Sequence, residues 1–183
     1  MKLVVLDRDG VINRDSPDFI RSPAQWEPLP GSLEAMAAFC RAGFTLAVAT
    51  NQSAIGRGLI DPATLHEIHA RMLSAVREAG GEIAHIAFCP HLPAANCNCR
   101  KPAPGMIDEI LQQVGVPEAG WIVGDRPSDL AAGMARGLKP VLVRTGRGQE
   151  FVDRRFLPQE CLIAGDLGEV ASMLIAGQGK EQD

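Results

Sequence analysis

Short, mainly apolar segments recur along the chain and predict the strands of a β-sheet. They lie at residues 3–6, 44–49, 83–88, 121–123, 140–143 and 161–164. A strand with one face in water alternates apolar and polar residues, whereas a strand covered on both faces is apolar throughout. The pattern therefore indicates strands buried between two layers, as in a parallel sheet.

Helical patterns fill the intervals between these segments. They cover residues 32–42, 61–79, 104–114, 128–136 and 166–175. Four of them are followed by a glycine where a helix usually ends, at Gly43, Gly80, Gly115 and Gly137. Strands that alternate with helices predict βαβ crossovers. We therefore expect an α/β fold with a doubly wound, mainly parallel sheet of Rossmann-like topology. No insertion is long enough to form a separate cap domain.

The chain is expected to form one domain, because 183 residues suffice for one hydrophobic core. This domain is predicted to cover residues 1–175, followed by a disordered polar tail at residues 176–183. Residues 13–30 are rich in proline and polar side chains, and we expect them to form an active-site flap. The chain has neither an apolar run of 18 residues nor a signal-peptide pattern, so we expect a cytoplasmic protein without a membrane partner.

Composition narrows the classes of ligand. The 46% hydrophobic and 22% charged residues are ordinary for a globular protein, and the formal net charge of −4 argues against nucleic acid as a partner. Fourteen arginines stand against four lysines. Because the guanidinium fork matches phosphate oxygens, this bias suits a small phosphorylated substrate. We expect the protein to act on such a molecule as a monomer.

Polar side chains follow the predicted strands at the points where the strands end. Asp7 and Asp9 follow the first strand, two residues apart, so that one carboxylate can be a nucleophile and the other an acid or base. Thr50 begins the polar segment TNQS at the end of the second strand, where hydroxyl, amide and backbone N–H groups suit phosphate oxygens. Each segment alone could instead be a solvated turn or a helix cap.

Two further segments supply charge. Arg100 and Lys101 precede the helix predicted at residues 104–114, and they offer a guanidinium for recognition and an ammonium that neutralises a phosphoryl group. Asp125 follows the fourth strand and is the kind of ligand that a hard divalent cation needs. A surface basic pair and a capped turn are the ordinary alternatives. Because the C-terminal ends of parallel strands meet at one edge of the sheet, the four segments together indicate one active site.

The four segments resemble the motifs of the haloacid dehalogenase superfamily of phosphotransferases: DRDGV at residues 7–11, ATNQS at 49–53, RKP at 100–102 and GDRPSD at 124–129. Within that superfamily the chain is most similar to the D-glycero-D-manno-heptose 1,7-bisphosphate 7-phosphatase family. The similar segments are LDRDG at 6–10, TNQS and IGRG between 50 and 58, CRKP at 99–102 and VRTG at 143–146. Histidinol-phosphate phosphatases carry similar motifs and are the alternative.

The resemblance implies a magnesium-dependent phosphohydrolase that removes the C7 phosphate of the heptose bisphosphate. This reaction belongs to the biosynthesis of nucleotide-activated heptose for the lipopolysaccharide core. Asp7 is then the nucleophile that forms an aspartyl-phosphate, and Asp9 is the acid/base. Thr50 and Lys101 hold the transferring phosphoryl group, and magnesium is bound by the side chains of Asp7 and Asp125 and the backbone carbonyl of Asp9.

The resemblance also implies a set of substrate-binding residues: Asp15, Asp18, Asn51, Gln52, Ser53, Arg57 and Arg100. The loop from Asp15 to Asp18 and the side chains of Asn51 and Arg100 are expected to face the substrate. This chain departs from the family's pattern at Asp18, where an aromatic residue is usual.

A cluster of potential ligands for a soft metal lies just before the basic pair: Cys89, His91, Cys97 and Cys99. Three thiolates and one imidazole within eleven residues suit tetrahedral zinc, and a closed set of four ligands leaves no position for a substrate. We therefore predict a structural zinc site that orders the loop and positions Arg100 and Lys101. A catalytic zinc and a loop of free thiols are the alternatives.

Two functions of other classes match parts of the pattern. A phospho-accepting receiver domain combines aspartates, a threonine, a lysine and magnesium on a similar sheet, but its acceptor aspartate follows the third strand. Here the third predicted strand ends at Phe88 and Cys89, without an acceptor carboxylate. A zinc-dependent binding module without catalysis would explain the cysteine cluster beside residues 100–102. It would leave the segments at residues 7–11, 49–53 and 124–129 without a role.

Overall fold

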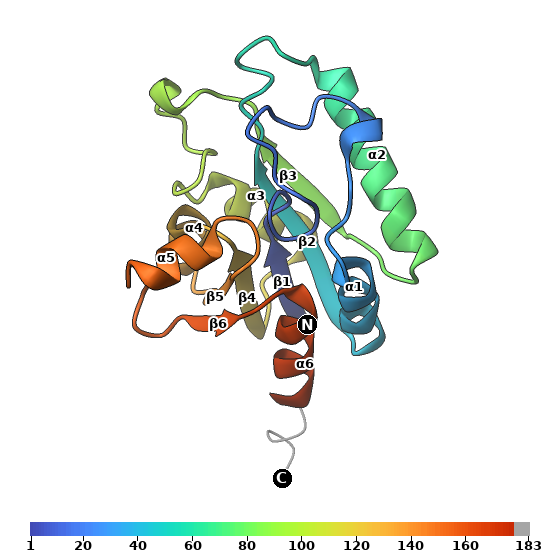
Figure 1. Ribbon diagram of the computed structural model, residues 1–183. Coiled ribbons are helices and arrows are strands. Elements are labelled where there is room, and N and C mark those ends of the chain that lie inside the picture. Colours follow the sequence, from blue (N-terminus) through green and yellow to red (C-terminus); the bar gives the residue numbers. More distant parts are fainter. Residues whose placement is uncertain (178–183) are drawn as a thin grey trace.

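Figure 1 shows the computed structural model, which describes residues 1–177. A six-stranded sheet forms its centre, made of β1 (Lys2–Leu6), β2 (Phe44–Asn51), β3 (His85–Cys89), β4 (Ala119–Gly124), β5 (Lys139–Val143) and β6 (Leu162–Ala164). All neighbouring strands are parallel, in the order β3-β2-β1-β4-β5-β6. This order confirms the predicted doubly wound sheet, and it places the topological switch point beside β1 and β4, where ligands bind in such sheets.

The five predicted helices are all present, with ends that differ from the predicted ends by no more than two residues. They are α1 (Ser32–Arg41), α2 (Pro62–Glu78), α3 (Gly105–Val114), α4 (Pro127–Met134) and α6 (Leu167–Gly177). The sequence did not indicate the short helix α5 (Gly148–Asp153) or the 3₁₀ turns η1 (Pro23–Gln25) and η2 (Pro93–Ala95), because so few residues show no helical period. No helix within residues 1–177 is both long enough and apolar enough to cross a membrane.

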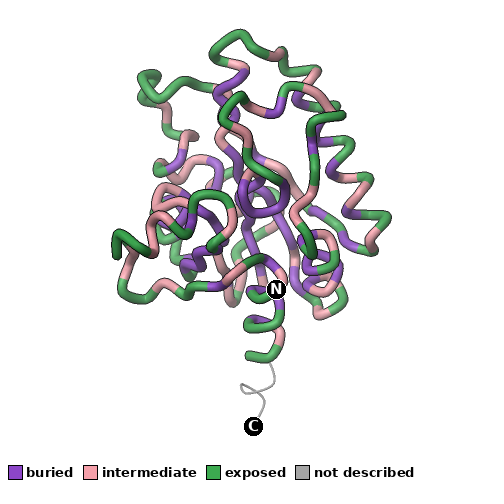
Figure 2. Tube along the Cα trace, in the orientation of Figure 1, coloured by how far each residue is buried: buried purple, intermediate pink, exposed green. Residues whose placement is uncertain are grey.

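Two layers of helices cover the two faces of the sheet. α1, α2 and α6 share one hydrophobic core with the sheet, and α3 and α4 share the other. Alternate residues of β1 serve the two cores: Val4 and Leu6 join the first, and Leu3 and Val5 join the second. None of these four side chains is exposed, which explains why residues 3–6 of the strand are all apolar. Figure 2 shows the same concentration of buried residues along the central strands.

The predicted flap, residues 13–30, is a loop with one 3₁₀ turn, η1. Its middle is not free, because Ile20 and Trp26 are buried in the core that contains α1 and α2. A bridge between Asn13 and Pro28 closes its two ends. At the C-terminus, α6 continues through Gly177, two residues past the predicted end of the domain at residue 175. The rest of that tail, residues 178–183, lies outside the described residues.

Gly10 makes a tight turn possible directly after β1. Its φ is +84°, a left-handed conformation that side chains disfavour, and its N–H donates to the carbonyl of Asn13 at 2.7 Å. A Cβ at this position would collide with the carboxylate of Asp125 and press on the backbone of Gly146. The turn is therefore restricted to glycine both by conformation and by space.

Gly10→Ala is expected to lower the free energy of unfolding in two ways. The left-handed conformation costs roughly 1–2 kcal/mol, and overpacking against Asp125 adds about 1–3 kcal/mol. Gly43→Ala is the matched control, because Gly43 has a φ of +80° and nothing within 4 Å of a Cβ, so that only the first cost applies. Urea-unfolding curves measure both variants, and an equal loss in the two would contradict the tight packing around Gly10.

Candidate active site

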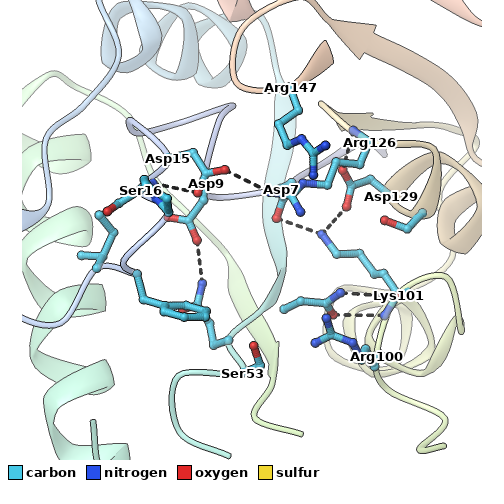
Figure 3. A pocket seen from close by; sticks show the side chains of 16 residues that line it. Asp7, Asp9, Asp15, Ser16, Ser53, Arg100, Lys101, Arg126, Asp129 and Arg147 are labelled. Carbon is cyan, nitrogen blue, oxygen red and sulfur yellow. Dashed lines mark hydrogen bonds and ion pairs between the residues drawn. The ribbon is translucent and has the colours of Figure 1, made fainter. Parts of the chain in front are cut away.

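A cavity of about 580 Å³ opens at the C-terminal ends of the central strands (Figure 3). It brings together eight residues that the sequence indicated: Asp7, Asp9, Asp15, Asn51, Gln52, Ser53, Arg100 and Lys101. Thr50 and Asp125 are buried just beneath its lining. The motifs therefore meet in one place, as the parallel sheet requires.

The floor of the cavity is an ion cluster around Lys101. The Nζ group of this lysine donates to Asp7 Oδ1 at 2.8 Å and to the carbonyl of Ala49 at 2.7 Å, and it lies 2.7 Å from Asp129 Oδ1. The three side chains are almost completely buried. Burial lowers the pKa of Lys101, but the charges of Asp129 and Asp7 outweigh burial and raise it. Lys101 is thus a permanently charged ammonium fixed beside Asp7.

Asp125 has an unsatisfied oxygen in the same cluster. Its Oδ2 accepts a hydrogen bond from the backbone N–H of Arg147 at 2.8 Å, whereas its buried Oδ1 has no hydrogen-bond partner among the described residues. Arg126 Nε lies 3.6 Å from Oδ1. Asp125, Asp7 and Asp129 each offer an oxygen within 4.8 Å of the others. Three carboxylates with one unsatisfied oxygen fit a hard divalent cation.

The pKa values of two of these carboxyls reflect the crowding of negative charge. Burial raises the pKa of Asp7, Lys101 lowers it in part, and Asp129 and Asp125 raise it further, to about 8. Burial and the charge of Asp129 likewise raise the pKa of Asp125 to about 6. A bound divalent cation would favour the charged forms of both.

Asp129 was not predicted as part of the metal group, although it belongs to the GDRPSD segment. Its Oδ2 accepts the backbone N–H of Arg126 at 3.0 Å and so caps α4, while its Oδ1 faces Lys101. The feature of the sequence that could have indicated this role is the second aspartate of the motif, four residues after Asp125. The spacing alone does not tell which of its two oxygens turns into the cluster.

Asp9 points away from Lys101 toward the second strand end (Figure 3). Its carboxylate accepts hydrogen bonds from the side chains of Arg8, Asn13 and Gln52. Burial raises the pKa of Asp9, but the Arg8 charge and these hydrogen bonds outweigh burial and lower it. Asp9 is therefore charged at neutral pH and held at the edge of the cavity.

The polar segment after β2 supports the cluster from the side. Thr50 is buried, and its Oγ1 accepts a hydrogen bond from Gln52 Nε2 at 2.8 Å. Asn51 exchanges two hydrogen bonds with the backbone of Lys101, at 3.1 and 3.3 Å, and so fixes the chain that carries the ammonium. Ser53 lines the cavity.

The flap and the segments opposite it form the rim. Asp15 pairs with Arg126 at 2.9 Å, which links the flap to the start of α4. Phe19 lines the cavity with an unusual φ of 63°, and the guanidinium of Arg57 lies 5.5 Å from its ring centroid. Two predicted substrate-binding residues, Asp18 and Arg57, do not line the cavity themselves. Phe19 instead supplies an aromatic side chain one position after Asp18.

Ser16 and Pro17 line the cavity as part of the loop from Asp15 to Asp18 that was expected to face the substrate, whereas six other lining residues were not singled out from the sequence: Phe19, Ile20, Arg126, Ser128, Asp129 and Arg147. Arg126 and Asp129 lie within a motif that was recognised, so the motif itself was the available signal. Arg147 follows the VRTG segment, and only its place after β5 brings it to the cavity. Together with Arg100, the two arginines Arg126 and Arg147 place three guanidinium groups in the lining of the cavity.

The cysteine cluster forms a second group that could hold a metal ion. Cys89, His91, Cys97 and Cys99 place their donor atoms within 4.8 Å of one another. The thiol sulfurs are 3.2–3.6 Å apart, and His91 Nδ1 lies 3.3 Å from the Cys99 sulfur. Ligands about 2.3 Å from a tetrahedral ion would be roughly 3.8 Å apart, so the slightly contracted set fits one.

The three thiols of this cluster differ in electrostatics: burial raises the pKa of Cys89, and burial together with hydrogen bonds to Cys89 and Cys97 raises the pKa of Cys99 to about 12, whereas Cys97 favours its thiolate form. Burial raises the pKa of Cys97, but a hydrogen bond from the backbone N–H of Arg100 and bonds from the neighbouring ligands outweigh burial and lower it to about 6. Arg100 Nη1 in turn donates to the carbonyl of His91 at 3.3 Å. The cluster is thus joined directly to the basic pair, as the sequence suggested.

Comparison with known proteins agrees with this geometry. The family model described as HAD-hydrolase-like matches residues 98–169. D-glycero-beta-D-manno-heptose-1,7-bisphosphate 7-phosphatase of Pseudomonas putida is 49% identical over 177 residues, which cover 96% of this chain and 100% of the relative. The enzyme of the same name from Neisseria meningitidis serogroup A is 53% identical over 84% of this chain and 83% of its own length. The chain belongs to the heptose-1,7-bisphosphate 7-phosphatase family.

A solved structure of this family has the same fold throughout. D,D-heptose 1,7-bisphosphate phosphatase from Bordetella bronchiseptica superposes with a TM-score of 0.91 at 44% identity, covering 97% of this chain and 99% of that one. That crystal structure contains magnesium and phosphate. The chain is therefore a phosphatase of the HAD family.

The raised carboxyl pKa values predict how magnesium stabilises this family member at different pH. Asp7 and Asp125 have folded-state pKa values of about 8 and about 6, against 3.8 in an unfolded chain, so they hold protons that unfolding releases. Their contribution to folding is present at low pH and is lost as the pH rises through these values. Since magnesium must displace the same protons, the increase in Tm on adding MgCl2 should be larger at pH 8 than at pH 6.

Thermal melts at constant ionic strength measure this difference. Asp125→Asn is the control, because it removes a charged ligand and should reduce the increase at both pH values. Equal increases at pH 6 and pH 8 in the unmodified protein would show that protons and magnesium do not compete there.

Proposed function

We propose that the chain hydrolyses the C7 phosphate ester of D-glycero-beta-D-manno-heptose 1,7-bisphosphate, with magnesium as cofactor. The observation that carries the proposal is the buried carboxylate of Asp7, held 2.8 Å from Lys101 beside Asp125 at the floor of a cavity with three arginines in its lining. The relatives named above support the choice of substrate.

Asp7 is proposed as the nucleophile, which takes the phosphoryl group and forms an aspartyl-phosphate that water then hydrolyses. Lys101 lies where it can neutralise charge on the transferring group, and Thr50 is proposed to bind a phosphoryl oxygen. The side chains of Asp7 and Asp125 and the backbone carbonyl of Asp9 would hold the magnesium. The bound cation supplies charge neutralisation of the phosphoryl oxygens.

Asp9 is proposed as the acid that protonates the leaving oxygen and as the base that later takes a proton from water. The charged form of Asp9 can take the proton from water. To protonate the leaving oxygen, Asp9 must first receive a proton itself. Its position at the cavity edge, on the side of the polar segment after β2, is where a leaving group directed outward would lie.

The rim favours a bisphosphate over histidinol phosphate. Arg100, Arg126 and Arg147 line the cavity outside the Asp7 cluster, and three guanidiniums can attract a second phosphate group. Histidinol phosphate has no second phosphate and carries an ammonium group, which these side chains would repel. The remaining predicted substrate contacts are Asp15, Asn51, Gln52 and Ser53, all of which line the cavity. Asp18 and Arg57 could act only from outside the lining, through Phe19 or through movement of the flap.

The receiver-domain alternative is disfavoured by strand order. Receiver domains of the CheY type have the order 2-1-3-4-5, in which the third strand neighbours the first. Here β3 is an edge strand, and it ends at Cys89 within the cysteine cluster. An acceptor aspartate at that place is therefore missing from the described part of the chain.

The cysteine cluster is proposed as a structural zinc site formed by Cys89, His91, Cys97 and Cys99. All four ligands come from the protein, so no coordination position is left for substrate. The cluster belongs to a loop with little regular structure, and metal binding would supply the free energy that orders it. We also propose that residues 1–175 act as one cytoplasmic, monomeric phosphatase domain, whose net charge of −4 speaks against nucleic-acid binding.

A panel of phosphate esters tests the proposed reaction. Heptose 1,7-bisphosphate, histidinol phosphate and 4-nitrophenyl phosphate are incubated with the protein, with and without magnesium, and released phosphate is measured. We expect the highest kcat/KM for the heptose bisphosphate, strict dependence on magnesium, and less than about a hundredth of the activity in Asp7→Asn. A higher kcat/KM for histidinol phosphate would assign the substrate to the alternative, and an active Asp7→Asn variant would overturn the nucleophile.

Cys99→Ser tests the separate role of the zinc cluster. We expect loss of bound zinc, a lower Tm, and a KM that rises more for the heptose bisphosphate than for 4-nitrophenyl phosphate, because Arg100 would be poorly positioned. Some loss of kcat is also expected, since about 1 Å of misplacement of Lys101 can cost roughly 10²-fold. Cys161→Ser is the control, because Cys161 lies outside the cluster. Elemental analysis measures the bound zinc, and kinetics measure the activity on each ester. A folded variant that is inactive toward every ester would instead favour a catalytic zinc.

A further inference from the structure

Arg8 lies between the two motif aspartates, and its side chain is completely buried. Its Nε donates to Asp9 Oδ1 at 3.1 Å, and its Nη2 donates to both oxygens of that carboxylate, at 2.9 and 3.0 Å. A buried guanidinium costs free energy unless its donors are paired. The proposed reaction gives Arg8 no task of its own, yet Arg8 holds the carboxylate that must transfer the proton.

His69 meets the same guanidinium from the helix layer. It lies on α2, and its Nε2 is 3.4 Å from Arg8 Nη1. Burial and the Arg8 charge lower the pKa of His69 to about 3, so the imidazole is neutral at physiological pH. Because arginine has no acceptor, Nε2 accepts the hydrogen bond and Nδ1 carries the proton. His69 is therefore an acceptor with a fixed tautomer.

Gln52 links the guanidinium to the cavity. Its Oε1 accepts from Arg8 Nη2 at 3.2 Å, and its Nε2 donates to Asp9 Oδ2 at 2.9 Å and to Thr50 Oγ1 at 2.8 Å. Within residues 1–177, His69 supplies the one side-chain hydrogen bond that joins Arg8 to a helix. The orientation of Arg8 is thus set from the helix layer on one side and transmitted to Asp9 on the other.

We propose that His69 is a positioning residue for phosphoryl transfer: it fixes Arg8, which in turn holds Asp9 in the orientation that proton transfer requires. The inference rests on the proposed role of Asp9 as the acid that protonates the leaving oxygen. Neither His69 nor Arg8 lines the cavity, so their effect must pass through Asp9. A misplaced acid slows the loss of an alkoxide but matters little when the leaving group needs no proton.

Three variants test this positioning role. His69→Leu removes the acceptor, His69→Gln places an amide oxygen near the position of Nε2, and His66→Leu is the matched control. His66 lies one turn earlier on α2 and also packs its ring edge-on against Phe88, but it is exposed and makes no hydrogen bond with Arg8. Each variant is assayed with the best alkyl phosphate of the panel and with 4-nitrophenyl phosphate. The value of kcat/KM is compared, because it reports the steps up to release of the alcohol.

In His69→Leu we expect kcat/KM for the alkyl phosphate to fall about tenfold or more, as a misplaced catalytic group predicts, and for 4-nitrophenyl phosphate by less than about twofold. His69→Gln should recover most of the lost activity, and His66→Leu should behave as the unmodified protein. Equal losses on both substrates, or no loss, would overturn the proposal. If His69→Leu does not fold, His69→Gln is compared with His69→Asn, whose shorter side chain cannot reach Arg8. Equal activity of those two variants on the alkyl phosphate would overturn it as well.

Asp9→Asn, assayed in parallel, separates this inference from the proposed function. If Asp9→Asn shows no dependence on the leaving group, the role of Asp9 itself is wrong. If Asp9→Asn shows the dependence and His69→Leu does not, only the positioning role of His69 fails. In the double variant the His69 change should add no further loss to that of Asp9→Asn, because both act on one group.

Discussion

The burial of the Lys101 ammonium group is the interaction on which the rest of the site depends. It lies among the carboxylates of Asp7 and Asp129 and the carbonyl of Ala49, almost out of contact with water. Carboxylates gathered at the ends of β1 and β4 repel one another strongly in such surroundings. One ammonium offsets part of that repulsion, and the free oxygen of Asp125 indicates where a second positive charge belongs. The arrangement of positive and negative groups in the cavity follows from this balance between the carboxylates and the Lys101 ammonium.

Lys101 is carried by a segment without a strand or helix, so other contacts must fix it. Asn51 binds its backbone through two hydrogen bonds, and the Cys/His cluster ends two residues before it, at Cys99. The ammonium is therefore positioned by β2 on one side and by the metal-ligand loop on the other. A change far from the reacting atoms can act on the reaction by moving this one group.

The sheet could be predicted because β1 and its neighbours are buried on both faces, which leaves an apolar run without alternation. The main site could be predicted for a related reason: parallel strands bring their C-terminal ends together, so motifs at residues 7–9, 49–53 and 124–129 had to meet. The short helix α5 gave no signal, since six residues with glycine and charged side chains show no period. Arg147, just before it, was consequently missed.

Side-chain direction is what the sequence did not reveal. The sequence assigned no role to Arg8, yet the turn at the end of β1 directs it inward, where Asp9 and His69 pair with its donors. Phe19 reaches the cavity because its backbone adopts a positive φ, which no pattern of hydrophobic residues indicates. Asp129 divides its two oxygens between a helix cap and Lys101, a choice that depends on tertiary packing.

The contact between Gly10 and Gly146 has a consequence for how such enzymes diverge. The loops after β1 and β5 lie so close together at these two glycines that a Cβ on either one would collide with the carboxylate of Asp125 and crowd the Cα of the other glycine. Neither loop can acquire a side chain there without displacing a group of the active centre. Grafting one of these loops from a distant relative would therefore succeed only if its partner were exchanged at the same time. The two loops therefore have to change together, although about 135 residues of sequence separate them.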